Sequence, residues 1–397
     1  MNNKHTVCIV TSENQPLDHP EQKFNDYFVN IAVQLASSLP QRDNDFHHIG
    51  GSLMNSFFFE KITPLEVIYA KKLLRNKTSS GHDTIPTRIV ISTIHSIAEI
   101  LTHLINQSFN SGIFPSCLKL AKIILIIKSK ENTDFTNFRP IPLLPGFSKT
   151  LEKILQKRLN SFLGKYNVIT ECQYGFRERH STELAIIRLV HKIGQAAEQK
   201  KYTAGVFLDL SKAFDSIDHT ILLYRLEKYG IRGKALDWIK SCLTDRYQYV
   251  EWNSKKSNKL KISLGVPQGS ILGPLLFILY INDLPNVSIL IDFVLFADDS
   301  NIFLSDHNIE NLITKTNYEI AKVLRWFEQN KLTINKLKTH FIIFGPRQYL
   351  NYKEPYKIIV DNHLIEECKS TEFLGIVLDQ KLTFKNHVLS VSSRNTK

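Results

Sequence analysis

Two adjacent carboxylates, Asp298 and Asp299, lie between two strongly apolar stretches in the last third of the chain. Residues 293–297 read Phe-Val-Leu-Phe-Ala, and residues 302–304 read Ile-Phe-Leu. Runs of this kind are typical of buried strands, so the acidic pair is predicted to form the turn between them. Burying an unpaired carboxylate is costly. The pair must therefore lie in water at the end of a hairpin, or next to cations.

A third carboxylate, Asp209, ends another short apolar run at residues 206–208. If this strand and the hairpin are neighbours in one sheet, the three carboxylates meet at one edge of that sheet. Three oxygen ligands without His or Cys suit Mg²⁺. Two such ions about 4 Å apart can stabilise the attacking and leaving oxygens of a phosphoryl transfer. The alternative is an exposed Asp-Asp turn that binds no metal.

The charge of the chain is strongly positive. Its 397 residues include 50 Lys and Arg against 38 Asp and Glu, a formal charge of +12. This excess favours a polyanionic partner, and the alternative is a basic globular protein without one. Residues 119–165 hold ten of the lysines and arginines against Glu131, Asp134 and Glu152. We therefore expect a local positive surface there.

Cysteine usage and hydropathy favour an intracellular protein. The five cysteines are scattered, without a C-x-x-C pair or a histidine at zinc-finger spacing: Cys8, Cys117, Cys172, Cys242 and Cys368. They are expected to be reduced thiols. The start of the chain lacks the pattern of a signal peptide, and the most apolar stretch, residues 271–281, is too short to span a bilayer. No membrane association is expected.

Hydrophobic periodicity predicts a mixed chain of helices and strands. A helix over residues 182–199 is expected to bury Leu184, Ile187, Val190 and Ile193, and a helix over residues 148–159 to present Lys149, Lys153, Lys157 and Arg158. Further helices are predicted near residues 22–39, in one segment that begins at 63 and another that runs through 105, and at 220–229, 234–243, 274–284 and 309–329. Strands are predicted at 120–127, 206–208, 247–252, 259–264 and 340–344, and near 358 and 373.

Two segments near the carboxylates have the composition of a nucleotide site. Residues 265–274 contain three glycines, which would let the backbone approach a flat ligand such as a base pair. Phe214 follows Asp209 by five positions, and its flat ring could lie under a bound sugar. The turn-rich loop at residues 77–86 could face a phosphate backbone or be an ordinary surface loop.

The order of these segments resembles the reverse transcriptase region of non-LTR retrotransposons, and is most similar to that of jockey-like and CR1-like elements. The resemblance covers about residues 64–387. Its blocks follow one another in family order: residues 138–141, the helix 148–159, 173–177 with 180–182, 207–215, 265–274 continuing to 280–283, 296–299 and 373–375. Chance similarity does not explain so many blocks at these spacings.

The resemblance implies an α+β right-hand polymerase with fingers and a ferredoxin-like palm built on an antiparallel sheet, and a thumb that is largely absent. It divides the chain into an N-terminal linker segment (1–62), fingers and upper palm (63–200) and the palm with the catalytic sheet (201–397). It implies two Mg²⁺ ions, replaceable by Mn²⁺, held by Asp209, Asp298 and Asp299. The implied partners are an RNA template, a DNA primer and deoxynucleotides, and activity is expected in the nucleus.

The resemblance also implies roles for the flanking blocks. Lys338 corresponds to a lysine near the leaving pyrophosphate, where it would act as a general acid, and Lys336 is close enough in sequence to be the alternative. Phe214 falls at the sugar-gate position, with a core phenylalanine as the alternative. The remaining positions would contact the triphosphate (Lys128, Arg139, Arg177), the nascent base pair (Gln268, Gly269) and the primer end (Leu374, Gly375). The alternatives are an ordinary surface lysine at 128, a turn that only leads into a helix at 268–269, and a β-turn without substrate contact at 374–375.

The chain departs from the family pattern in three loops and in its extent. Pro142 replaces the usual serine, Thr84 a glycine and Phe384 a tryptophan, which affects local loop geometry. The full family protein has an endonuclease domain before this region and a thumb after it, so the chain is expected to be a fragment. Two rival functions stay open: a non-catalytic nucleic-acid-binding remnant, and another phosphoryl-transfer enzyme such as a nucleotide cyclase.

Overall fold

The computed structural model describes residues 18–37, 51–128, 134–345 and 355–395, and these form two compact units. Unit 1 comprises described residues 18–37, 51–128, 134–168 and 214–277. Unit 2 comprises described residues 169–213, 278–345 and 355–395. Both units combine segments that are far apart in the sequence. The predicted division into fingers and palm uses consecutive ranges, so these units do not test it and it stays a prediction.

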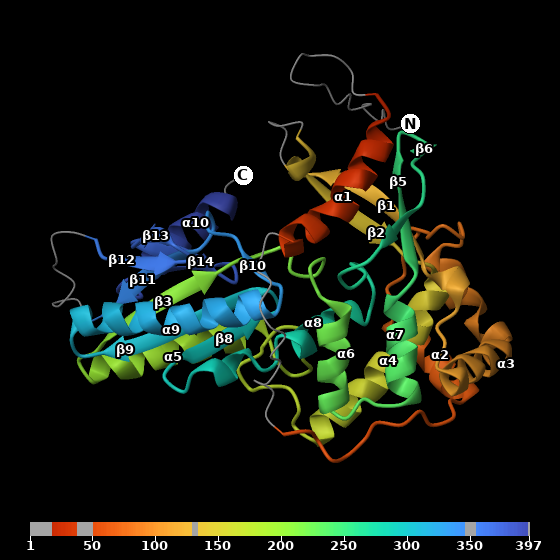
Figure 1. Ribbon diagram of the computed structural model, residues 1–397, viewed down its shortest axis with the longest axis horizontal. Helices are drawn as coiled ribbons and strands as arrows, with labels where there is room; N and C mark the ends of the chain where they lie inside the picture. Colours follow the sequence, from red (N-terminus) through yellow and green to blue (C-terminus); the bar gives the residue numbers. More distant parts are fainter. Residues whose placement is uncertain (1–17, 38–50, 129–133, 346–354, 396–397) are drawn as a thin grey trace. The chain divides into compact units, whose positions relative to one another are not determined.

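Unit 1 combines helices with a mixed sheet (Figure 1). In this sheet β1 pairs antiparallel with β2 and parallel with β5, and β5 also pairs antiparallel with β6 and β7. The helices are α1 (Pro20–Ser37), α2 (Pro64–Leu73), α3 (Thr87–Ser111), α4 (Gly146–Lys165), α6 (His219–Lys228), α7 (Lys234–Leu243) and most of α8 (Gly273–Tyr280), with 3-10 turns at Ser116–Leu118 and Phe135–Asn137. The strands are β1 (Leu120–Ile127), β2 (Phe138–Leu143), β5 (Arg246–Trp252), β6 (Lys255–Lys256) and β7 (Leu260–Ile262).

Strand β2 was not predicted, because Pro140 and Pro142 interrupt the residue pattern that is typical of a strand. Proline cannot donate to a strand ladder and is confined to edge strands. The strand order β2-β1-β5 places β2 at an edge, where Ile141 lies opposite Ile124.

Helix α3 is long and apolar enough, by length and composition alone, to cross a membrane, and it is the one such helix in the described parts of the chain. Core helices of globular proteins meet the same criteria. Here α3 packs on α2, α4 and α7 and buries a stripe that includes Val90, Ile94, Ala98 and Phe109. The sequence points to residues 271–281 as the most apolar stretch, whereas the helix that meets these criteria is α3.

The predicted lysine face of α4 is partly occupied by contacts within unit 1. Arg158 forms an ion pair with Glu66 (2.9 Å), and Lys157 lies over the ring of Tyr69. Lys149 is half-buried. Its burial, and to a smaller extent the charge of Lys77, lowers the pKa of its side chain. One cation of this face is thus neutralised by an ion pair and Lys157 stays exposed, so the positive surface stays a prediction.

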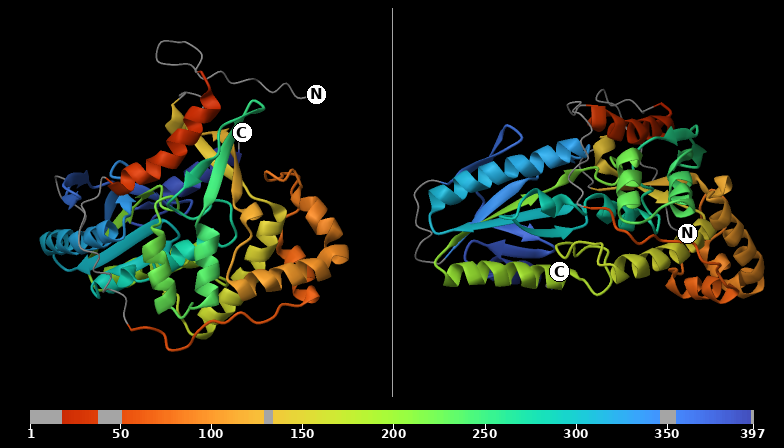
Figure 2. Two further views of the ribbon diagram at one scale, coloured as in Figure 1. Left: turned by 45° about the vertical axis from the view of Figure 1, so that its right-hand side comes forward. Right: turned by 60° about the horizontal axis from the view of Figure 1, so that its bottom comes forward.

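Unit 2 is built on a four-stranded antiparallel sheet in the order β11-β3-β9-β8. The strands are β3 (Tyr202–Leu208), β8 (Asp292–Phe296), β9 (Asp299–Asp306) and β11 (His340–Phe344). Helix α5 (Thr182–Glu198) and helix α9 (Ile309–Gln329) cover opposite faces of this sheet (Figure 2). Smaller elements complete the unit: β4 (Leu210–Ser211), the 3-10 turn Leu284–Val287, β10 (Thr333–Ile334), β12 (Lys357–Val360), β13 (His363–Glu366), β14 (Ser370–Phe373), β15 (Ile376–Asp379) and α10 (Lys385–Asn395).

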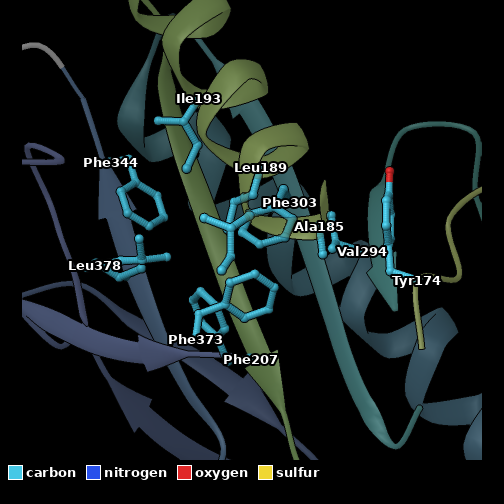
Figure 3. Packing of buried hydrophobic residues seen from close by; sticks show 12 residues of the cluster. Tyr174, Ala185, Leu189, Ile193, Phe207, Val294, Phe303, Phe344, Phe373 and Leu378 are labelled. Atoms are coloured by element: carbon cyan, nitrogen blue, oxygen red, sulfur yellow. The ribbon is translucent and has the colours of Figure 1, made fainter. Parts of the chain in front are cut away.

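The predicted buried stripe of α5 is wrong at two positions. Leu184 and Ile187 are 45% and 62% exposed, and the helix instead buries Ala185, Ile186 and Leu189. Figure 3 shows Ala185, Leu189 and Ile193 directed toward strand residues of the sheet core. Residues 184–190 are nearly all apolar, so helical periodicity fits two neighbouring stripes equally well. Packing against Phe207 and Phe303 decides between them.

Candidate active site

The three carboxylates singled out in the sequence lie at one edge of the unit 2 sheet. Strand β3 pairs antiparallel with β9, and its last residue, Leu208, lies opposite Ser300. Asp209 therefore follows directly beside the start of β9, where Asp299 lies. The β8–β9 hairpin closes at the Phe296–Asp299 pair, with Ala297 and Asp298 in its turn. The condition that these strands are neighbours in one sheet is met, and the apolar residues on both sides of the acidic pair are buried, as predicted. The predicted turn is shifted by one residue, because Asp299 already belongs to β9 and only Asp298 of the pair lies in the turn.

The acidic pair has the electrostatics of crowded carboxylates. Burial and the charge of Asp209 raise the pKa of Asp298 above its usual value. Burial, together with the charges of Asp298 and Asp209, raises the pKa of Asp299 to about 6, although this side chain keeps access to water. The charge of Asp209 thus disfavours the ionised form of Asp298, and the charges of Asp209 and Asp298 disfavour that of Asp299; a bound cation would relieve this repulsion.

Lys338 supplies the positive charge nearest to this group. Its Nζ lies 3.2 Å from Asp209 Oδ2, and the lysine side chain is 67% exposed. The turn that carries it is fixed to the same strand end, because Asn335 N donates to Asp209 O (2.8 Å) and Lys338 N donates to Asn335 O. Lys336, the alternative, pairs with Asp361 at 2.6 Å. The structure thus places Lys338, and not Lys336, against the carboxylates.

A cavity of about 450 Å³ opens beside the carboxylates within unit 2. Asp209, Asp299, Lys338 and Leu374 are among its lining residues. Leu374 and Gly375 form the turn between β14 and β15, both with positive φ, as expected for the predicted turn. Four residues predicted separately therefore meet around one cavity. His340, which sequence reasoning missed, lines it as well and stacks on Phe207.

Arg177 lies in the loop before α5, also in unit 2. Its Nη1 donates to the carbonyl oxygens of Thr170 (2.7 Å) and Gln173 (3.1 Å). Burial lowers its pKa from the usual value. One end of the guanidinium is thus fixed by its own loop.

The predicted base-pair and sugar contacts lie in unit 1. Phe214 is partly buried and stacks on Phe277 of α8, with ring centres 4.6 Å apart. Gln268 Nε2 donates to Asp215 Oδ1 at 2.6 Å. Gly269 has φ +77°, and a Cβ there would lie 2.9 Å from Pro142 O, so the close approach made possible by this glycine is to the protein's own strand β2.

Lys128 and Arg139 lie at the same end of the β1–β2 pair in unit 1. Arg139 is exposed opposite Ile126, and Lys128 follows the end of β1. Lys128 Nζ donates to the carbonyl oxygen of Thr136 at 2.7 Å. Both are surface cations, and their predicted contact with the triphosphate stays a prediction.

A buried glutamate that sequence reasoning did not single out supports residues 265–273. Glu152 of α4 is 1% exposed and accepts hydrogen bonds from Ile271 N (2.7 Å), Leu272 N (3.3 Å) and Ser148 Oγ (2.7 Å). Its only sequence signal is a carboxylate inside an apolar helical stripe. Glu152 fixes the loop that carries Gln268.

The chemistry of the donor set fits a hard divalent cation. Asp209, Asp298 and Asp299 offer only oxygen donors, and burial together with neighbouring carboxylates raises the pKa values of Asp298 and Asp299. Within the described residues, however, no group of three or more His, Cys, Asp and Glu side chains is already arranged to hold an ion. Asp209 faces the ammonium of Lys338 instead.

Comparison with known proteins identifies one family model and several relatives. Residues 127–378 match the model described as reverse transcriptase (RNA-dependent DNA polymerase). The chain is 28% identical over 376 residues to the RNA-directed DNA polymerase from mobile element jockey of Drosophila melanogaster, covering 90% of this chain and 40% of that protein. The probable RNA-directed DNA polymerase from transposon X-element of the same fly is 28% identical, covering 90% of this chain and 39% of that protein. The probable RNA-directed DNA polymerase from transposon BS, also of this fly, is 29% identical, covering 95% of this chain and 41% of that protein. The chain thus spans about two fifths of the length of these relatives, and the predicted resemblance to jockey-like elements is confirmed.

Proposed function

Since the chain belongs to the reverse transcriptase (RNA-dependent DNA polymerase) family, we propose that it catalyses RNA-templated DNA synthesis. In this reaction a primer 3′-hydroxyl attacks the α-phosphate of a deoxynucleotide and pyrophosphate leaves. The observation that carries the proposal is the convergence of Asp209 with Asp298 and Asp299 at one sheet edge, beside Lys338 and a cavity. A ferredoxin-like palm is supported by the antiparallel sheet of β3, β8, β9 and β11, in which α9 connects β9 to β11 along the chain.

The three carboxylates are the residues that would hold divalent cations. Bound Mg²⁺, or Mn²⁺ in its place, would activate the primer hydroxyl and offset the charge of the leaving pyrophosphate. The raised pKa values of Asp298 and Asp299 mean that their oxygens become available as ligands only when the pH is high enough to ionise them.

Lys338 is proposed to donate a proton from Nζ to the leaving pyrophosphate. In the structure this ammonium is paired with Asp209. Since the lysine is largely exposed, it can turn from the carboxylate toward an anionic substrate in the cavity it lines.

The remaining residues are proposed to select and orient the nucleotide. The Arg177 guanidinium, held through Nη1, would contact the triphosphate with its other nitrogens, since a planar fork suits phosphate oxygens. Phe214 is held by its stack on Phe277 and would exclude a ribose 2′-hydroxyl. Gln268 and Gly269 would pack on the nascent base pair, and Leu374 and Gly375 on the primer end.

Primer extension on matched RNA and DNA templates tests this function. The whole chain should extend a DNA primer on RNA when Mg²⁺ is present, and an Asp298→Asn variant should lose the activity. Asp292→Asn is the matched control, because Asp292 begins the same hairpin but pairs with Lys192 at 3.0 Å. Unchanged extension by Asp298→Asn contradicts the proposal. Salt-sensitive RNA binding without incorporation at any metal concentration would instead indicate a non-catalytic remnant.

A further inference from the structure

Gln173 lies where the loop that carries Arg177 meets the hairpin that carries Asp298. The segment around it adds to the outer edge of the unit 2 sheet: Gln173 bridges Leu295 in parallel, Tyr174 N donates to Leu295 O (2.8 Å), and Leu295 N donates to Cys172 O (2.9 Å). Tyr174 joins the hydrophobic cluster of the sheet (Figure 3). The segment is therefore a fixed part of the sheet edge.

The side chain of Gln173 joins two backbone segments through a single oxygen atom. It is 1% exposed, and its Oε1 accepts from Gly175 N (2.7 Å) and from Ala297 N (3.1 Å). Ala297 immediately precedes Asp298. At the same time the backbone oxygen of Gln173 accepts from Arg177 Nη1. One residue thus contacts both the arginine proposed to bind the triphosphate and the turn that carries a catalytic carboxylate.

The turn at Ala297 needs such support. Ala297 has φ +56°, in the left-handed region that is unfavourable for a residue with a Cβ and persists only where surrounding contacts hold it. Gly175 packs so closely on this turn that a Cβ on it would lie 2.4 Å from Ala297 N. The two backbone segments cannot move independently while these contacts exist.

The choice of glutamine over glutamate fits this site. Nε2 of Gln173 has no hydrogen-bond partner among the described residues, and a buried unpaired donor is destabilising. Glutamate would accept the same two hydrogen bonds and remove the unpaired donor. It would also place a negative charge against the backbone of Ala297, the residue before the Asp298 carboxylate. A neutral acceptor avoids placing a charge there.

We propose that Gln173 is a positioning residue that couples the Arg177 loop to the Asp298 turn, so that nucleotide binding and the catalytic carboxylate respond together. The kinetic consequences rest on the proposed function, because they assume roles for Arg177 and Asp298. The structural coupling itself does not depend on activity.

The coupling is tested in the whole chain without metal or nucleotide by hydrogen exchange. Gln173→Met keeps the length of the side chain but removes the acceptor, so the amides of Gly175 and Ala297 should both exchange about tenfold faster or more. Gln173→Glu should restore protection of both amides. Asn330→Ala, which removes a buried side-chain bond to Trp326 O elsewhere in unit 2, is the control for general destabilisation and should leave both amides protected.

The kinetic arm measures single-nucleotide incorporation by the same variants. Gln173→Met should raise KM for the deoxynucleotide and lower kcat, each by about tenfold, whereas Arg177→Lys should act mainly on KM. Gln173→Glu should recover KM but keep a reduced kcat. Unchanged exchange in Gln173→Met, faster exchange at only one amide, or the same kinetics as Asn330→Ala would overturn the proposal. If the parent chain incorporates nothing, the proposed function fails and the exchange data alone decide on the coupling.

Discussion

Asp299 shows, at the scale of one residue, how the edge of a sheet can favour cation binding at a carboxylate. Its pKa of about 6 lies above the usual 3.8, because burial and two neighbouring carboxylates disfavour its charge. The native chain therefore binds a proton between about pH 4 and 6 more readily than the unfolded chain does. The contribution of this group to stability is largest at low pH and is lost as the pH rises through 6.

Asp299→Asn should therefore stabilise the metal-free chain at neutral pH. Allowing for the access of water to this side chain, we expect a gain of about 1 kcal/mol in the free energy of unfolding near pH 7.5, and almost none near pH 4.5. Urea unfolding with a chelator present, at both pH values, measures this. Equal effects of the substitution at the two pH values would show that the charge of Asp299 is not responsible.

Phe214 tests the proposed discrimination between sugars. Phe214→Val shortens a side chain that now stacks on Phe277, and should increase incorporation of ribonucleotides relative to deoxynucleotides by about ten- to a hundredfold. Competition between the two nucleotides in primer extension measures the ratio. An unchanged ratio would assign Phe214 to the core of unit 1.

The site residues predicted from the sequence and those missed by it differ in the kind of interaction they make. Asp209, Asp298, Asp299 and Lys338 carry charge in apolar or turn contexts, so their types and positions are visible in the sequence. Gln173 and Glu152 act through hydrogen bonds to backbone atoms of segments 124 and 119 positions away. Such contacts exist only after folding. Gln173 lies in a block of the family resemblance and Glu152 is a carboxylate in an apolar helical stripe, but neither signal identifies the distant backbone that the side chain contacts.

At the scale of elements, long periodic segments were predicted well and proline-containing or ambiguous ones were not. The ranges predicted for β1, α7, α9 and β11 agree with the structure. Strand β2 was missed because its prolines are tolerated only at a sheet edge, a fact of tertiary structure. The buried face of α5 was shifted because apolar residues surround much of that helix.

Helix α4 supports residues 265–273 through Glu152, which gives an element-scale prediction. Glu152→Gln should lower the free energy of unfolding by about 2 kcal/mol, because the amides of Ile271 and Leu272 lose a charged acceptor. Glu227→Gln on α6, at an exposed position in the same unit, is the matched control and should change stability by less than about 0.5 kcal/mol. Urea unfolding compares the two variants, and equal effects would contradict this role of Glu152.

At the scale of the whole molecule, the net charge of +12 fits a chain that binds a polyanion. RNA binding should weaken by about tenfold or more between about 50 and 200 mM salt, because the release of counterions from the phosphates becomes less favourable as the salt concentration rises. Filter binding across this range measures the slope. Affinity that does not change with salt would contradict a surface that binds the phosphate backbone.

We infer that Asp209, Asp298 and Asp299 act as one divalent-cation site. Binding of Mn²⁺ to the whole chain, followed by electron paramagnetic resonance, tests this inference and does not require polymerase activity. We predict that Asp209→Asn and Asp298→Asn each weaken binding by about tenfold or more, that Asp292→Asn leaves it unchanged, and that binding declines below about pH 6. Equal Mn²⁺ affinity in the parent chain and in both triad variants would contradict this inference.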